Sequence, residues 1–153
     1  MGIVVFLFLI QLGFLFYTYL ALHARRWLFD DRFGKTYTFA TTGVSGFVLG
    51  MMLIFLLQPF QDYVALGVIV LGGLIGILFG SLYKTQTVLS GFWNGSVGGL
   101  MGAMLGLVVL DPALCGLPGV AARDIIGNIL MFSIFGTIVL VVTLWLVKFS
   151  LRV

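Results

Sequence analysis

The sequence predicts an all-α integral membrane protein built as a bundle of five transmembrane helices. Hydrophobic residues make up 61% of the 153 residues and charged residues only 8%, whereas a soluble domain carries about 25% charged residues. The apolar residues also gather into five stretches of about 20 residues, which is the length that crosses the hydrocarbon core of a bilayer. We therefore expect residues 1–153 to form a single membrane domain with lipid as its solvent.

Each predicted span is followed by residues that favour the membrane interface or interrupt a helix. Basic residues follow the first, third and fifth spans, and a proline follows each of the second and fourth spans closely. The predicted spans are Ile3–Leu22, Tyr37–Leu57, Tyr63–Tyr83, Val88–Leu110 and Ile125–Val147.

The distribution of positive charge predicts the orientation of these spans. With five spans, only Arg123 lies on the side of the N-terminus, and seven basic residues lie on the other side. These seven are Arg25, Arg26, Arg32, Lys35, Lys84, Lys148 and Arg152. Because cytoplasmic loops carry an excess of lysine and arginine, we expect the N-terminus outside and the C-terminus in the cytoplasm. The expected location is a bacterial cytoplasmic membrane.

Two pairs of similar segments suggest an internal repeat. The motif K-T-x-T occurs at residues 35–38 and 84–87, and S-G-F-x-x-G follows each copy, at residues 45–50 and 90–95. This pattern predicts two parallel helical hairpins after a unique, peripheral first span. The hairpins would comprise residues 35–83 and 84–148. The alternative is a chance resemblance within a chain of simple apolar composition.

Glycines form stripes on the third and fourth spans. At about 100° per residue, the six glycines between Gly91 and Gly106 fall within an arc of roughly 100°. A glycine stripe allows the backbone of a neighbouring helix to approach closely in lipid. We expect the two stripes to meet, with Gly95, Gly99 and Gly102 near the glycines of the third span. The predicted helix-packing residues are Gly72, Gly76, Gly80, Gly91, Gly95, Gly98, Gly99, Gly102 and Gly106.

No charged residue and no histidine lies inside a predicted span, which argues against proton relays and ion-coupled carriers. The candidate polar contacts are Ser45, Asn94, Ser96 and Asn128, and the spans also contain Gln11, Ser133 and Thr137. These side chains have two interpretations. They bridge helices through hydrogen bonds, or they contact a transported solute.

The first basic loop mixes cationic and aromatic residues, which suits contact with anionic lipids or with a partner protein. Its candidate contacts are Arg25, Arg26, Trp27, Arg32 and Lys35. The alternative is that these charges only set the topology and that the aromatic residues mark the interface.

The sequence predicts neither catalysis nor a cofactor. One histidine, one cysteine and no carboxylate within a span leave no nucleophile–base pair to assemble. Methionines within the spans could bind copper(I), but they also pack as ordinary gap fillers, and we expect no metal. A net charge of +3 near the membrane does not suggest nucleic acid.

We interpret the chain as a non-enzymatic membrane protein that packs as a subunit or assembly partner in a larger membrane complex. Its expected partners are membrane lipids and other membrane subunits or a second copy of itself. The alternative is a small channel or uncoupled carrier for an ion or small solute, with glycine faces lining the path.

Overall fold

The computed structural model describes residues 2–25, 31–112, 116 and 125–150, and this part of the chain contains helices and no strands. All five long helices are apolar enough to cross a membrane. The elements are α1 (Gly2–Arg25), α2 (Asp31–Leu56), the 3₁₀ turn η2 (Gln58–Phe60), α3 (Gln61–Gly80), α4 (Thr85–Leu110) and α5 (Ile125–Ser150). The predicted all-helical fold with five candidate membrane spans is therefore confirmed.

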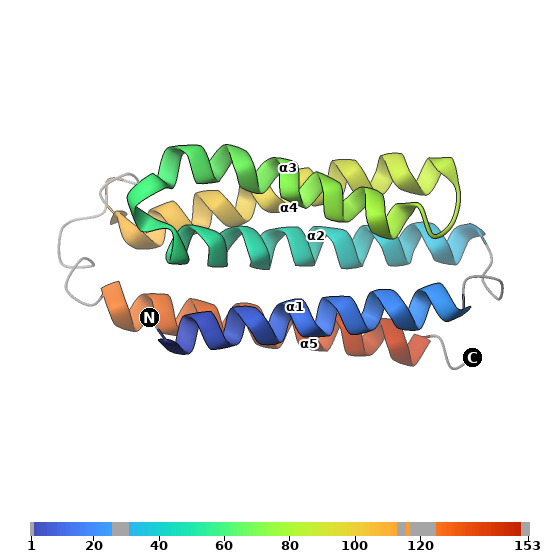
Figure 1. The fold of residues 1–153 in the computed structure, drawn as a ribbon, viewed down its shortest axis with the longest axis horizontal. Coiled ribbons are helices and arrows are strands. Elements are labelled where there is room, and N and C mark those ends of the chain that lie inside the picture. The colour runs from blue at the N-terminus through green and yellow to red at the C-terminus, as the bar shows by residue number, and fades with distance from the viewer. Residues whose placement is uncertain (1, 26–30, 113–115, 117–124, 151–153) are drawn as a thin grey trace.

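The helices run alternately up and down the bundle, so the N- and C-termini lie at opposite ends (Figure 1). They form two layers: α2, α3 and α4 pack together, and α1 and α5 lie side by side against them. Helix α2 contacts each of the other four helices and buries the largest share of its length. The core of the protein therefore forms around α2.

The helix ends differ from the predicted spans mainly at one end of the bundle. Helix α2 begins at Asp31 rather than Tyr37, α3 ends at Gly80 rather than Tyr83, and α4 begins at Thr85 rather than Val88. Hydrophobicity marks the length that hydrocarbon covers, whereas α2 and α4 also continue through polar residues next to the membrane. Helix α3 ends earlier than predicted because residues 81–84 form the turn into α4. The predicted first loop is therefore helical from Asp31 onward.

Two short turns hold the central helices in register. Between α2 and α3, Pro59 lies within the turn η2, where its missing N–H and its restriction of the preceding residue interrupt the helix. Between α3 and α4, the hydroxyl of Thr87 accepts a hydrogen bond from the backbone N–H of Lys84 at 2.9 Å and lies 3.0 Å from the carbonyl oxygen of Gly80. Both turns make the joined helices close antiparallel neighbours.

The two copies of the predicted repeat have different local structures. Residues 35–38 lie inside α2, whereas residues 84–87 contain the turn that starts α4. Helices α2 and α3 also pack closely over much of their length, but α4 and α5 touch only slightly. The duplication stays a prediction from the sequence, and the two segments do not pack alike.

Candidate functional site

The closest helix contact joins α3 to α4 through glycines of both helices. A Cβ atom added to Gly72 would overlap the carbonyl oxygen of Gly95, and one added to Gly76 would overlap that of Gly91. The reverse also holds, since a Cβ on Gly91 or Gly95 would overlap the carbonyl oxygen of Gly76 or Gly72, respectively. At these positions only glycine leaves room for the two backbones, which gain dispersion contacts from their close approach.

A second row of glycines on α4 packs against α2. Cβ atoms on Gly98 and Gly102 would overlap the carbonyl oxygens of Gly43 and Phe47, respectively. A Cβ on Gly106 would lie 2.9 Å from the Cβ of Ile54. These glycines therefore face α2, so the prediction that Gly102 lies near the glycines of α3 is wrong.

Helix α2 also has two glycines that face α4. A Cβ on Gly46 would lie 2.5 Å from the carbonyl oxygen of Gly95, and one on Gly50 would lie 2.7 Å from that of Gly99. Gly99 in turn faces Val68 of α3, whose carbonyl oxygen would be 2.8 Å from an added Cβ. Gly95 and Gly99 thus lie where all three helices meet, and α4 fits between α2 and α3. We call this three-helix unit the glycine core.

The remaining predicted packing residue, Gly80, closes the end of the glycine core. Its added Cβ would lie 2.5 Å from the Cα of Val88 in the first turn of α4. Gly67, on the same helix α3, is exposed, and an added Cβ there would meet nothing within 4 Å. The glycines of α3 therefore divide into those that face α4 and one that faces the membrane.

The four polar candidates lie in or beside the bundle but do not converge on one site. Ser45 is fully buried and donates a hydrogen bond to the carbonyl oxygen of Thr42 in its own helix at 3.1 Å. Asn94 donates to the carbonyl oxygen of Ser90, also in its own helix, at 2.8 Å. Ser96 is half-buried beside Gly73, and Asn128 is half-buried in the first turn of α5. The first two side chains bond within their own helices instead of bridging helices.

Gln11 has a partner on α5 that the sequence does not predict. Its side chain is fully buried and its amide Nε2 donates a hydrogen bond to Oγ1 of Thr137 at 2.7 Å. Thr137 donates in turn to the carbonyl oxygen of Ser133 at 2.7 Å. Gln11 carries the one side-chain amide of α1, a helix that is otherwise mainly apolar. This isolated polar side chain was the signal in the sequence that could have indicated a hydrogen-bond partner on another helix. The hydrogen bond ties α1 to α5 within the membrane-spanning part of the bundle.

A row of buried hydroxyl groups on the first half of α2 was also missed. Thr38, Thr41 and Thr42 are almost completely buried, and the hydroxyl of Thr42 donates to the carbonyl oxygen of Thr38 at 2.7 Å. The side-chain oxygen of Thr38 has no hydrogen-bond partner. Threonine in a membrane helix commonly bonds to its own preceding turn, so the sequence gives little sign of which threonines are buried.

The predicted contacts of the first loop fall mostly outside the described residues. Arg26 and Trp27 lie outside the described residues, and so do the side chains of Arg25 and Arg32, although these two belong to α1 and α2. Lys35 is exposed on α2. At this end of the bundle Tyr83 is half-buried with its ring against Gly34, and burial raises its pKa above the ordinary value for tyrosine.

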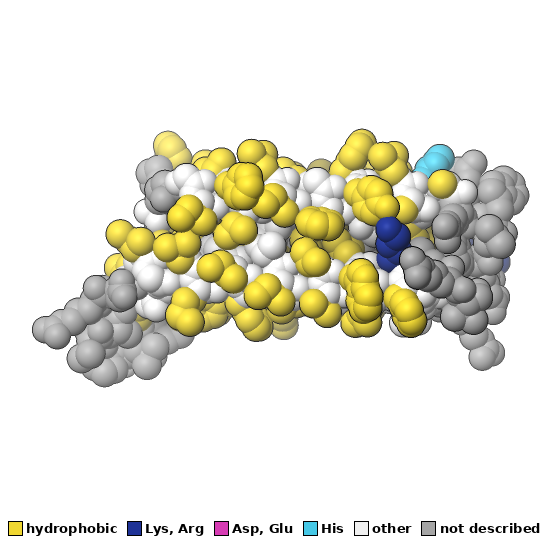
Figure 2. Space-filling view, turned by 90° about the horizontal axis from the view of Figure 1, so that it is seen from below, with side chains coloured by type: hydrophobic (Ala, Val, Ile, Leu, Met, Phe, Trp, Pro, Cys, Tyr) yellow, Lys and Arg dark blue, Asp and Glu magenta, His cyan; other side chains and the backbone are white. Residues whose placement is uncertain are grey.

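The outer surface is apolar along the length of the bundle, with basic side chains near one end (Figure 2). On α5, the Lys148 ammonium donates to the hydroxyl of Tyr17 at 2.9 Å and lies 4.9 Å from the centre of its ring. In the described part of the chain, no three histidine, cysteine, aspartate or glutamate residues come together as metal ligands.

In comparisons with family models, curated proteins and solved structures, nothing matches this chain.

Proposed function

We propose that the protein is a non-enzymatic membrane protein that serves as a helix-packing subunit or assembly partner in a larger membrane complex. The observation that carries this proposal is the closed glycine core. Its glycine faces are occupied by backbone of the same chain, and the side chains around it present large apolar groups outward. A rigid centre with an apolar exterior suits a component that organises neighbouring helices.

The alternative function, a channel or uncoupled carrier, is supported by buried polar groups and not by the glycine faces. A path along the glycine faces is disfavoured, because even a methyl group does not fit between α4 and its neighbours at most of these positions. Transport is favoured by the buried side-chain oxygens of Gln11, Thr38 and Ser133, which have no hydrogen-bond partner. They would offer polar contacts on helices α1, α2 and α5, at residues other than the predicted Ser45, Asn94, Ser96 and Asn128.

Purification of the protein followed by a flux measurement distinguishes the two functions. We expect the tagged chain, extracted from its native membrane in mild detergent, to elute with a stoichiometric membrane protein or as a defined homo-oligomer. Proteoliposomes that contain the isolated chain should pass ions and small solutes no faster than protein-free vesicles. A monodisperse monomer that speeds solute flux would overturn the subunit proposal in favour of the carrier.

We also propose that the N-terminus faces outward and the C-terminus faces the cytoplasm. The alternating helices bring Lys35, Lys84 and Lys148 to one end of the bundle, and the excess of basic residues belongs on the cytoplasmic side. A cysteine inserted after Met1, in a chain whose Cys115 is replaced by serine, should react with an impermeant thiol reagent added outside. One inserted after Val153 should not react. The reverse labelling would exclude this orientation.

A further inference from the structure

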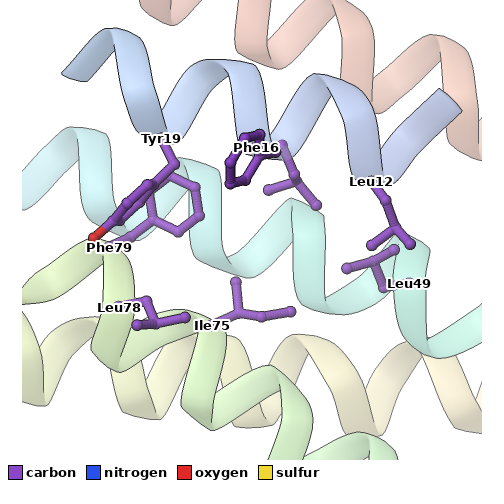
Figure 3. Close-up of a pocket in the computed structure, with 8 residues that line it drawn as sticks. Leu12, Phe16, Tyr19, Leu49, Ile75, Leu78 and Phe79 are labelled. Carbon is purple, nitrogen blue, oxygen red and sulfur yellow. The ribbon is translucent and has the colours of Figure 1, made fainter. Parts of the chain in front are cut away.

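A groove in the side of the bundle separates α1 from α3, with α2 at its base. Eight residues line it: Leu12, Leu15, Phe16, Tyr19, Leu49, Ile75, Leu78 and Phe79 (Figure 3). Leu15, Leu49 and Phe79 are buried and form its floor, whereas Phe16 and Leu78 are largely exposed on its two rims. The lining is apolar apart from Tyr19, so the groove suits an apolar occupant.

We propose that this groove binds an acyl chain of an anionic phospholipid. The proposal does not rest on the proposed function, because it concerns a surface outside the glycine core.

The shape of the groove favours an acyl chain over a helix from a partner protein. The cavity has a volume of about 440 Å³, and it extends from Leu12 to Tyr19, about two turns or roughly 10 Å of α1. Over this length the volume corresponds to an average cross-sectional area of about 40 Å², whereas an α-helix that is about 10–12 Å across with its side chains has a cross-sectional area of about 80–110 Å². A flexible hydrocarbon chain fits such a slim groove, and acyl chains are the surrounding solvent at this depth.

The two ends of the groove differ in chemistry. Leu12 and Leu49 lie at one end and Tyr19 lies beside Phe79 at the other (Figure 3), with the two rings edge to face at a centroid distance of 5.5 Å. His23 follows one turn later on α1, its ring 6.3 Å from that of Tyr19. A tyrosine at the end of an apolar groove is typical of the membrane interface, so this end is where the lipid headgroup would lie.

One wall of the groove leads to a basic residue at the headgroup end. Helix α3 is followed by Lys84, an exposed residue that precedes α4. Lysine and arginine next to the membrane attract anionic lipids. This charge selects an anionic headgroup, while the groove holds the chain attached to it.

The test uses the full-length chain purified in detergent from vesicles that contain equal amounts of phosphatidylglycerol and phosphatidylcholine. Native mass spectrometry counts the lipids that stay bound through detergent exchange. We expect the wild-type protein to retain one phospholipid, with a roughly fivefold preference for phosphatidylglycerol, as expected from one cation near the headgroup.

Two pairs of variants test the acyl-chain site and the headgroup site independently. Leu78→Trp places a larger side chain on the groove rim and should lower lipid retention at least about fivefold, whereas Leu66→Trp, exposed on the same helix but outside the groove, should not. Lys84→Gln should abolish most of the preference for phosphatidylglycerol, and Lys148→Gln, at the same end but on α5, should preserve it. Thermal unfolding in detergent checks that each variant is folded.

If folded Leu78→Trp retains as much phospholipid as the wild-type protein, the acyl-chain site is wrong. An unchanged lipid preference in Lys84→Gln would overturn the headgroup assignment. If a crosslinking residue placed at position 78 instead joins this protein to a second protein in stoichiometric amount, the groove is a protein interface and the lipid proposal is wrong.

Discussion

Helices α3 and α4 meet through glycines whose backbones touch, whereas α1 and α5 meet through larger side chains and the partly buried hydrogen bond from Gln11 to Thr137. The first contact loses its geometry when a single methyl group is added. The second is a side-chain contact that can adjust when one partner changes. In lipid, where apolar surface gains little by leaving its surroundings, close packing and interhelical hydrogen bonds are the available sources of stability. The two layers of this protein rely on these sources in different proportions.

The largest effect should come from breaking the glycine core. Gly99 lies between Val68 of α3 and Gly50 of α2, so Gly99→Leu forces both neighbours apart. Inserting extra carbon atoms into a tight core costs about 1–3 kcal/mol where the surroundings can adjust, and backbone adjusts less readily than side chains. We expect the free energy of unfolding in mixed detergent micelles to fall by about 3 kcal/mol or more.

Val108→Leu is the control for this substitution, because it enlarges a half-buried side chain elsewhere on α4. It should change the stability by less than about 1.5 kcal/mol, as hydrophobic replacements of similar size usually do. Equal losses in the two variants would mean that α4 tolerates bulk equally on both faces.

A smaller effect should come from the contact between α1 and α5. The coupling energy between Gln11→Leu and Thr137→Val, measured in a double-mutant cycle, should be about 0.6 kcal/mol, the average for hydrogen bonds within a membrane protein. Thr143 is the control, since its hydroxyl donates to the carbonyl oxygen of Val139 in its own helix. Gln11→Leu combined with Thr143→Val should be additive, and a coupling as large as that with Thr137 would contradict this assignment.

The smallest effect should come from the exposed end of the α1–α5 layer. Lys148→Gln removes the hydrogen bond and the ring contact with Tyr17, and exposed contacts of this kind contribute below about 1 kcal/mol. The stability of the variant should therefore lie within about 1 kcal/mol of wild type, and Tyr17→Phe should lower it by even less. A larger loss would show that this end anchors the layer.

The sequence predicts the helical spans well because bilayer thickness sets their length and hydrophobicity marks it directly. It does not predict that α2 begins at Asp31 or α4 at Thr85, because helix ends beyond the hydrocarbon depend on local hydrogen bonds. The hydrogen bond between Thr87 and Lys84 at the start of α4 is an example. The glycine stripe is visible by its spacing, but its division between α3 and α2 is not. Gly98 and Gly102 turn toward α2 because α4 lies between two helices, an arrangement that only tertiary packing determines.

Glycines of α3 are required where they face α4 and are dispensable elsewhere on the same helix. Gly76→Ala and Gly67→Ala add the same methyl group to α3, yet the first collides with the backbone of Gly91 and the second meets nothing within 4 Å. Alanine favours a helix over glycine by about 1 kcal/mol, so Gly67→Ala should leave stability unchanged or raise it. Gly76→Ala should lower the free energy of unfolding in mixed micelles by about 1–3 kcal/mol. Equal stabilities of the two variants would contradict the glycine core.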